Sequence, residues 1–454
     1  MSRYEDIENR LSTLLNSLER SYVNKTKISG NLFDRARKVF PGGTTYHIRY
    51  LSPYPPYIVR GKGTKVWDVD GNEYLDFWMG HGAHVLGHSP DFVIESVYEA
   101  SKNGTHLGFE NPYSLEYAEF LTKILPNIDM FKFCVSGTEA NMYVTRLARA
   151  YTRRPYVIKV EGGWHGGYDS LHTHVNLVGG PESAGLPEEF IKYTIAVPFN
   201  DLDAVENVLK KHPVAAILLE PLVGGGGCLT PAEDYLKGLR QLTYQYGSLL
   251  IFDEVITGFR LALGGGQEFF NVGSDLAVYG KVIGGGYPGA GGFGGRAEVM
   301  ELLDNLKYPD QRARSYHGGT FVGNLITVTA GHTLVKYLAE HRSVYESANS
   351  LWDEEARKLE SICREYGDLC YVTGAGTMRA VHFTKRRPKN SREFRELRWS
   401  KIIEKVFNLY ARVNGVLYIG EKFFHVYPSL IQGREEVEYL VKIFGDFMGS
   451  ISRQ

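Results

Sequence analysis

The hydrophobic pattern of the amino-terminal part of the chain predicts one helix and one hairpin. In residues 3–20 the apolar side chains recur at the three- and four-residue intervals of an amphipathic helix. They are Ile7, Leu11, Leu14, Leu15 and Leu18. Residues 40–57 are rich in proline, glycine and tyrosine and are expected to be irregular. Residues 65–69 and 73–77 fit two strands joined by a turn that contains Asp-Gly.

Short apolar runs alternate with helical patterns through the middle of the chain. The clearest strands are residues 130–135, 156–160, 215–219, 248–253 and 276–279. Helices are expected at residues 139–151, 202–210, 231–246 and 327–341. This alternation is typical of an α/β fold, in which helices cover both faces of a mainly parallel sheet.

The pattern changes after about residue 340. A charged helix, two short strands and a last helix predict a smaller α+β domain; they are residues 347–366, 377–382, 423–425 and 434–448. We therefore predict a large domain of residues 76–335 and a small domain of residues 336–454, which the segment of residues 1–75 joins.

Composition and charge exclude several classes of protein. The 51 lysines and arginines balance the 52 acidic residues, so neither nucleic acid nor a membrane surface is an expected partner. Because the chain contains neither an apolar run of about 18 residues nor a signal peptide, we expect a cytoplasmic protein. The four cysteines form no C-x-x-C motif and are expected to be free thiols of a reducing compartment. They are Cys134, Cys228, Cys363 and Cys370.

Small polar residues follow the first strong strand of the middle part. Ser136, Gly137 and Thr138 come directly after it and lead into a helix. Backbone N–H groups at the start of a helix bind anions such as phosphate, because they have no partners within the helix. An ordinary N-cap needs the same residue types, so both interpretations stay open.

Two further strands end in candidate catalytic residues. Asp253 lies at the strand edge where parallel sheets place ligands, and it suits a cationic ring nitrogen as well as it suits a structural ion pair. Lys281 follows another strand and precedes a run of glycines. A buried lysine can lose its proton and attack a carbonyl, although a lone lysine at a strand end is more often a surface residue. A P-loop is excluded because Val282 follows Lys281 where Ser or Thr is required.

Weaker candidates lie in a glycine-rich turn. Trp164 and His165 suit stacking on a flat ring, but a buried tryptophan with its neighbour fits equally well. His172 and His174 lack a third ligand at zinc spacing, so no metal is expected. The successive strand ends thus carry a phosphate anchor, a stacking group, a carboxylate and a lysine amine. Pyridoxal 5'-phosphate (PLP) needs these four parts.

The chain resembles the class III (subgroup II) PLP-dependent aminotransferases of fold type I, and within them the glutamate-1-semialdehyde 2,1-aminomutase subfamily. The similarity extends from about Ala36 through the last helix. The matching segments are FPGG (40–43), GKGTKVWDVDGNEYLDF (61–77), VLGH (85–88), SGTEANM (136–142), RLARAYT (146–152), FDEVITGFR (252–260), GKVIGGG (280–286), FGG (293–295) and GTFVGN (319–324). The resemblance makes the domain of residues 76–335 the PLP-binding domain.

The resemblance implies a role for each cofactor contact. Lys281 would form the Schiff base with PLP and carry the proton between substrate and cofactor, and Asp253 would pair with the ring nitrogen. The other contacts would be Ser136, Gly137 and Thr138 on the phosphate, Val255 and Trp164 on the two ring faces, His165 beside the ring, and Thr320 on the phosphate of the neighbouring subunit of a homodimer.

The substrate side departs from the aminomutases. Arg49 matches the family arginine that binds a substrate carboxylate, but His81 stands in place of a tryptophan and Tyr46 in place of a serine. We therefore expect an aminotransferase that moves an amino group from a carboxylate-bearing amino compound to a keto acid through pyridoxamine 5'-phosphate. The aminomutase itself, which gives 5-aminolevulinate, and an amino-acid racemase or epimerase are the alternatives. A non-catalytic relative does not fit a chain that retains both Lys281 and Asp253.

Overall fold

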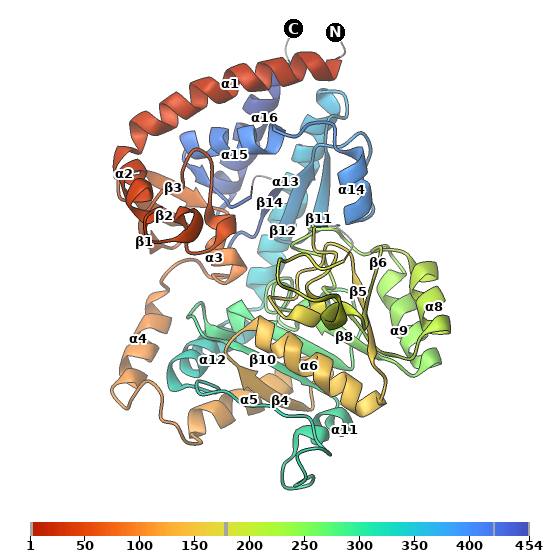
Figure 1. Ribbon diagram of the computed structural model, residues 1–454. Coiled ribbons are helices and arrows are strands. Elements are labelled where there is room, and N and C mark those ends of the chain that lie inside the picture. Colours follow the sequence, from red (N-terminus) through yellow and green to blue (C-terminus); the bar gives the residue numbers. More distant parts are fainter. Residues whose placement is uncertain (1–2, 177–179, 421–422, 453–454) are drawn as a thin grey trace. The chain divides into compact units, whose positions relative to one another are not determined.

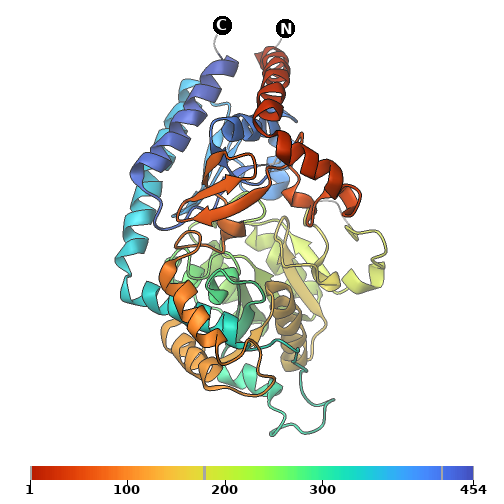
Figure 2. The ribbon, with the colours of Figure 1, turned by 90° about the vertical axis from the view of Figure 1, so that its left-hand side faces the viewer.

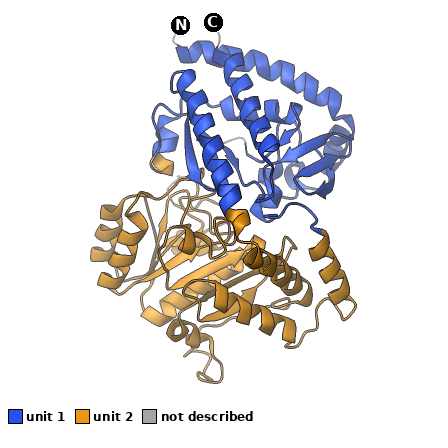
Figure 3. Cartoon of the chain, turned by 180° about the vertical axis from the view of Figure 1, so that it is seen from behind, with its two compact units in different colours: residues 1–90, 346–388, 393–454 blue, residues 91–345, 389–392 orange. Residues whose placement is uncertain are grey.

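The computed structural model describes residues 3–176, 180–420 and 423–452 (Figure 1). The chain forms two compact units (Figure 3). Unit 1 gathers both ends of the chain, namely residues 1–90, 346–388 and 393–454. Unit 2 is nearly continuous and consists of residues 91–345 with the short segment 389–392.

Unit 2 is built on a seven-stranded sheet with the order β4-β10-β9-β8-β7-β5-β6. The strands are β4 (Met130–Cys134), β5 (Tyr156–Val160), β6 (Thr194–Val197), β7 (Val214–Leu219), β8 (Leu249–Asp253), β9 (Leu276–Gly280) and β10 (Gly291–Gly295). The ladder from β6 to β9 is parallel, and β10 is antiparallel to both of its neighbours. The α/β class with a mainly parallel sheet is confirmed.

Helices cover both faces of this sheet because successive strand residues point to opposite sides. In β7, Ala216 and Leu218 belong to the apolar cluster beneath α6, whereas Ile217 and Leu219 belong to the cluster beneath α8 and α9. The main helices of unit 2 are α4 (Asp91–Ser101), α5 (Pro112–Ile124), α6 (Gly137–Thr152), α8 (Leu202–Lys211), α9 (Tyr235–Tyr246) and α12 (Leu325–Glu340). Over the described residues, no helix of either unit is long and apolar enough to cross a membrane.

The strand β10 has no counterpart among the predicted strands. Four of its five residues are glycines, which give no alternating pattern. Glycine is required because the neighbouring backbone lies too close for a side chain. A Cβ atom at Gly291 would lie 2.5 Å from the Ser136 carbonyl oxygen, and one at Gly295 would lie 2.2 Å from that of Asp275. This glycine-rich segment therefore forms an internal strand of the sheet, between β4 and β9.

Unit 1 joins segments from opposite ends of the sequence. The predicted hairpin is present as β2 (Lys65–Asp68) and β3 (Glu73–Asp76), and β13 (Val416–Leu417) pairs in parallel with β3. The predicted first helix is α1 (Arg3–Lys25), which contacts α15 (Ile403–Val413) and α16 (Arg434–Ser452) (Figure 2). Unit 1 also contains the helices α2 (Lys27–Ala36) and α3 (Met79–Gly82), most of α13 (Ser343–Glu365) and of α14 (Ser391–Leu397), and the strand β1 (Ile58–Lys62). A three-stranded sheet consists of β11 (Tyr371–Ala375), β12 (Met378–His382) and β14 (Phe424–Val426).

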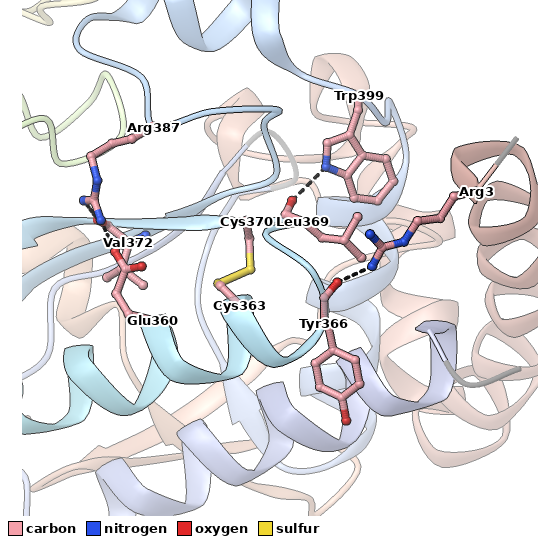
Figure 4. Close-up of a disulfide and its surroundings, with 9 residues drawn as sticks. All are labelled: Arg3, Glu360, Cys363, Tyr366, Leu369, Cys370, Val372, Arg387 and Trp399. Carbon is pink, nitrogen blue, oxygen red and sulfur yellow. Dashed lines mark hydrogen bonds and ion pairs between the residues drawn. A yellow bond between two sulfur atoms is a disulfide. The ribbon is translucent and has the colours of Figure 1, made fainter.

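One disulfide corrects the expectation for the cysteines. Cys363 near the end of α13 is bonded to Cys370 just before β11, so these two residues are not free thiols (Figure 4). Cys134 and Cys228 are buried and take part in no disulfide among the described residues, which agrees with the expectation for these two. The disulfide was missed because only folding brings the two residues to a Cα–Cα distance of 5.2 Å. Disulfides are rare in reducing compartments. The cytoplasmic location therefore stays a prediction that the cysteines no longer support.

Candidate active site

The ends of α6, β8 and β9 meet around one valine side chain. A Cβ atom at Gly137, in the first turn of α6, would lie 2.7 Å from a methyl carbon of Val255. A Cβ atom at Gly280, the last residue of β9, would lie 3.1 Å from the other methyl carbon. The expected phosphate anchor, the β8 carboxylate and Lys281 therefore surround Val255 in one place, and glycine keeps the space beside it open.

Ser136 is the N-cap of α6, and the first turn of this helix also presents backbone N–H donors. Ser136 Oγ accepts a hydrogen bond from the Glu139 N–H at 3.2 Å, so the N-cap interpretation is correct. The N–H groups of Gly137 and Thr138 lie in the first turn, where the helix offers no acceptor, and remain suited to an anion. The turn of residues 162–167 lies directly against this site, because a Cβ atom at Gly166 would lie 2.1 Å from Thr138 Oγ1.

The carboxylate of Asp253 is buried among neutral donors. Asn141 Nδ2 donates to Oδ2 at 2.8 Å, and the Val255 N–H donates to Oδ1 at 3.0 Å. His165 Nδ1 lies 2.8 Å from Oδ2 and carries the hydrogen in that bond when the carboxylate is ionised. A carboxylate offers about four acceptor sites, so one remains for a further donor. A protonated pyridine nitrogen would supply that donor together with the positive charge that the buried carboxylate requires.

The neighbouring acidic groups make the site favourable for positive charge. Burial raises the pKa of both Glu220 and Glu254 to about 7, and the nearby charge of Asp253 contributes to each increase. Burial lowers the pKa of Lys281, while Asp253 and Glu220 oppose that shift. A lysine with a lowered pKa has a larger fraction of neutral amine, which is the nucleophilic form. The burial of Lys281 therefore favours the neutral amine that can react with an aldehyde.

Trp164 and His165 occupy different environments although they are adjacent. The indole of Trp164 is 38% exposed and contacts the ring of His172 edge-on, with centroids 5.8 Å apart. His165 is buried, and its burial lowers the pKa of the imidazole, so the ring is neutral near pH 7. Trp164 is thus available to a flat ligand, whereas His165 orients the Asp253 carboxylate.

The remaining expected residues belong to other parts of the chain. Thr320 is exposed in the loop before α12, and among the described residues no hydrogen bond joins it to Asp253 or Lys281. Arg49 and His81 belong to unit 1. The Arg49 guanidinium is exposed and donates to Thr45 Oγ1 at 3.0 Å.

His81 lies in a strained segment beside two aromatic side chains. Met79, Gly80, His81 and Gly82 all have positive φ values, from 48° to 81°, a conformation that costs energy for residues other than glycine. The His81 ring lies 5.3 Å from the ring of Trp78 and 6.0 Å from that of Tyr46. Tyr46 and His81, the two substitutions on the expected substrate side, therefore contact each other.

The same aromatic cluster contains a histidine that should make stability depend on pH. His425 packs against Trp78 and Tyr427, and burial lowers its pKa from 6.5 to about 4. Between these values the unfolded chain binds a proton that the folded chain does not, so stability is lost as the pH falls through this range. Between pH 6.5 and 5 the unfolding free energy of the wild type should therefore decrease. We expect the decrease to be about 2 kcal/mol smaller in His425→Phe. Urea unfolding at both pH values measures this difference, and an equal loss in both proteins would refute the assignment.

Three polar residues of this site were not singled out from the sequence. Asn141 donates to Asp253, and Lys159 and Glu220 make buried contacts with the turn that carries Trp164. Glu220 follows the end of β7 as Asp253 ends β8, so the same strand-end signal could have found it. Lys159 interrupts an apolar strand, which is a second usable signal because an unsupported charge is rarely buried.

A mainly parallel sheet that carries a lysine, a carboxylate and a helix start with unbonded N–H groups at its strand ends is the arrangement of a PLP-dependent enzyme of fold type I. The chain belongs to the class III aminotransferase family, because the family model described as "Aminotransferase class-III" matches residues 49–448. Its cofactor is PLP, and it acts on small molecules as an aminotransferase or aminomutase.

Individual relatives carry both kinds of name. A glutamate-1-semialdehyde 2,1-aminomutase from Archaeoglobus fulgidus is 37% identical over 418 residues, which cover 91% of this chain and 97% of the relative. An omega-transaminase structure from Sphaerobacter thermophilus has a TM-score of 0.85 and 32% identity, and the match covers 93% of this chain and 97% of that one. A glutamate-1-semialdehyde aminomutase structure from Pseudomonas aeruginosa has a TM-score of 0.87 and 25% identity, with 98% and 99% covered. Similarity alone therefore does not separate the two reactions.

Proposed function

We propose that this enzyme is an intermolecular aminotransferase that passes an amino group from a carboxylate-bearing amino compound to a keto acid. The contact between Tyr46 and His81 carries the proposal, because both residues differ from what an aminomutase is expected to have on the substrate side. A tyrosine fills much more space than a serine, and an imidazole fills less than an indole. The pair would therefore change the shape of the substrate site without altering the cofactor contacts.

Intramolecular amino transfer is the second candidate, and the 37% identity to a named aminomutase favours it. The two reactions differ in whether a separate acceptor is needed. The test supplies glutamate-1-semialdehyde alone, and in a second reaction an amino acid together with a keto acid. Turnover only with both partners supports the aminotransferase, whereas 5-aminolevulinate formed from the semialdehyde alone overturns it.

We propose that unit 2 is the cofactor-binding domain and that its residues have separate tasks. PLP, when bound, acts as an electron sink for bonds at the substrate α-carbon. Lys281 holds the cofactor aldehyde and moves a proton at the α-carbon, and Asp253 keeps the ring nitrogen protonated. Ser136, Gly137 and Thr138 hold the phosphate, while Val255 and Trp164 enclose the ring.

We propose that Arg49 binds the carboxylate of the substrate. Its guanidinium is exposed, is always protonated and offers a planar pair of donors that matches a carboxylate. We expect Arg49→Ala to raise KM for carboxylate-bearing substrates by about 10- to 100-fold, the loss of a charge-assisted hydrogen bond, with the cofactor still bound. Steady-state kinetics measure the change. Arg60→Ala, which removes another exposed cation of unit 1, is the control. An unchanged KM for Arg49→Ala would exclude this role.

We also propose a homodimer in which Thr320 reaches the phosphate in the neighbouring subunit. Unit 2 exposes large apolar side chains on α4, on α5 and on the segment between these helices, and one more lies next to Thr320 in the sequence. So many exposed apolar side chains are unusual for a surface that faces only water. Phe109, for example, is 87% exposed. Others are Ile94, Tyr98, Leu107, Leu115 and Phe321. A second copy of the chain would bury this surface.

A further inference from the structure

One peptide bond of the Trp164 turn lies between two buried groups of opposite charge. The carbonyl oxygen of Gly163 accepts a hydrogen bond from Lys159 Nζ at 3.0 Å. The N–H of Trp164, on the other side of the same peptide bond, donates to Glu220 Oε1 at 3.1 Å. Lys159 lies in β5, and Glu220 directly follows β7, the strand paired in parallel with β5. Adjacent strands thus place an ammonium and a carboxylate on opposite ends of one peptide dipole.

Both charged groups are fully committed to backbone partners. The side chain of Lys159 is 0% exposed, and its ammonium also donates to the carbonyl oxygens of Leu171 at 3.1 Å and Thr173 at 2.8 Å. Glu220 is 2% exposed, and its Oε2 accepts from the Gly224 N–H at 2.9 Å. All three hydrogens of the ammonium and both oxygens of the carboxylate therefore form hydrogen bonds with backbone groups of the loops. Burying charges is costly. The arrangement is therefore better explained by a role in orienting the loop backbone than by a contribution to the overall stability of the fold.

The N–H groups of Trp164 and Gly224 oppose the increase in the Glu220 pKa that burial causes, so they favour the ionised carboxylate. This carboxylate and the Lys159 ammonium together select one orientation of the peptide plane. Hydrogen bonds to ionised groups are roughly twice as strong as neutral ones. If the Gly163–Trp164 peptide rotated by half a turn, its carbonyl oxygen would point at the carboxylate and its N–H at the ammonium. Both contacts would be repulsive. A glycine-rich turn would otherwise be free to make this rotation, because glycine tolerates most backbone conformations.

We propose that Lys159 and Glu220 are positioning residues that lock the Gly163–Trp164 peptide and so hold the Trp164 indole against the cofactor ring. The inference rests on the proposed stacking role of Trp164. Neither residue touches the ring in this scheme. They act through the turn backbone, which also carries His165 and hence one of the contacts of Asp253.

The test uses the full-length holoenzyme with Lys159→Met, Glu220→Gln and Trp164→Ala. We expect each variant to weaken the visible circular dichroism per bound cofactor and to raise the PLP dissociation constant by about tenfold or more. Glu220→Gln keeps the shape of the side chain but cannot accept both N–H groups. If Lys159→Met does not fold, Glu220→Gln decides the question. In the Trp164→Ala background, Glu220→Gln should add no further loss of dichroism.

Two controls distinguish positioning of the turn from a general loss of stability and from a direct effect of charge. Arg240→Met removes a partly buried cation of unit 2, whose buried partner is Asp275 at 2.8 Å, and should lower the melting temperature without changing the dichroism. Lys159→Met and Glu220→Gln remove charges of opposite sign, so a purely electrostatic effect on Lys281 would shift the absorbance band in opposite directions. Weakened dichroism in both variants is the expected result.

Other results would contradict either the positioning role of Lys159 and Glu220 or the stacking role of Trp164. If both charge variants behave like Arg240→Met, or shift the band in opposite directions with full dichroism, the positioning role is overturned while the function stands. If Trp164→Ala itself changes neither dichroism nor affinity, Trp164 does not stack on the ring, and the proposed role of the turn fails together with the inference.

Discussion

Replacing Lys281 with alanine should abolish the visible absorbance band that borohydride bleaches and lower kcat by about 10³-fold or more. The variant loses the amine that holds the aldehyde and moves the proton, and positioned proton transfer alone contributes about 10²–10⁴-fold. PLP should still bind, because the start of α6 and Asp253 are unchanged. Absorbance before and after borohydride, together with steady-state rates, measures both effects.

The matched control is Lys210→Ala, which removes an exposed lysine of α8 that pairs with Glu206. It should retain the band and the wild-type rate. A borohydride-sensitive band that persists in Lys281→Ala would show that another lysine holds the cofactor, and the assignment of the site around Val255 would then be wrong.

Replacing Asp253 with asparagine should lower kcat by about 10²–10³-fold while leaving the fold intact, as is typical when one electrostatic contact to the reacting group is removed. Asparagine can still accept from the Val255 N–H. It has no negative charge to hold a proton on the ring nitrogen. Its side-chain amide is also a poorer acceptor than the carboxylate for the hydrogen bonds from Asn141 and His165. Rates at saturating PLP, with the bound cofactor measured in parallel, separate slower chemistry from lost binding.

Asp275→Asn is the control for that experiment. Asp275 is also a buried carboxylate of unit 2, but it pairs with Arg240 and Arg296. Its replacement should lower the melting temperature and leave kcat per bound cofactor nearly unchanged. If kcat for Asp253→Asn stays within about threefold of the wild-type value, the proposed pairing is excluded. Removing such an electrostatic contact should lower kcat far more than that.

The sequence predicted the parts of unit 2 that depend on local pattern. Strands β7, β8 and β9 are continuous apolar runs, and such runs identify buried parallel strands well. The residues at the strand ends, among them Ser136, Asp253 and Lys281, could be singled out because polar groups there face a ligand site. In contrast, β10 has almost no side chains, so neither its apolar content nor its period could identify it.

Other features arise only from tertiary structure. Lys159 and Glu220 are 61 residues apart in numbering, and only the β5–β7 pairing brings both to one peptide bond. The disulfide depends on the turn between α13 and β11, and the positive φ value of His81 leaves no mark in the residue type. Local patterns therefore identified the elements and the reacting groups, whereas the contacts that orient them required the folded chain.

The construction of unit 1 from both ends of the sequence has a consequence for synthesis on the ribosome. Unit 2 is almost continuous and can fold as it emerges, but α1 must wait for α15. At about 5–20 residues per second, translation from Lys25 to Ile403 takes roughly 20–75 s. During that time Ile7, Leu11 and Leu18 lack the surface that buries them in the finished protein. Slower translation would lengthen the time for which these side chains of α1 are exposed to water.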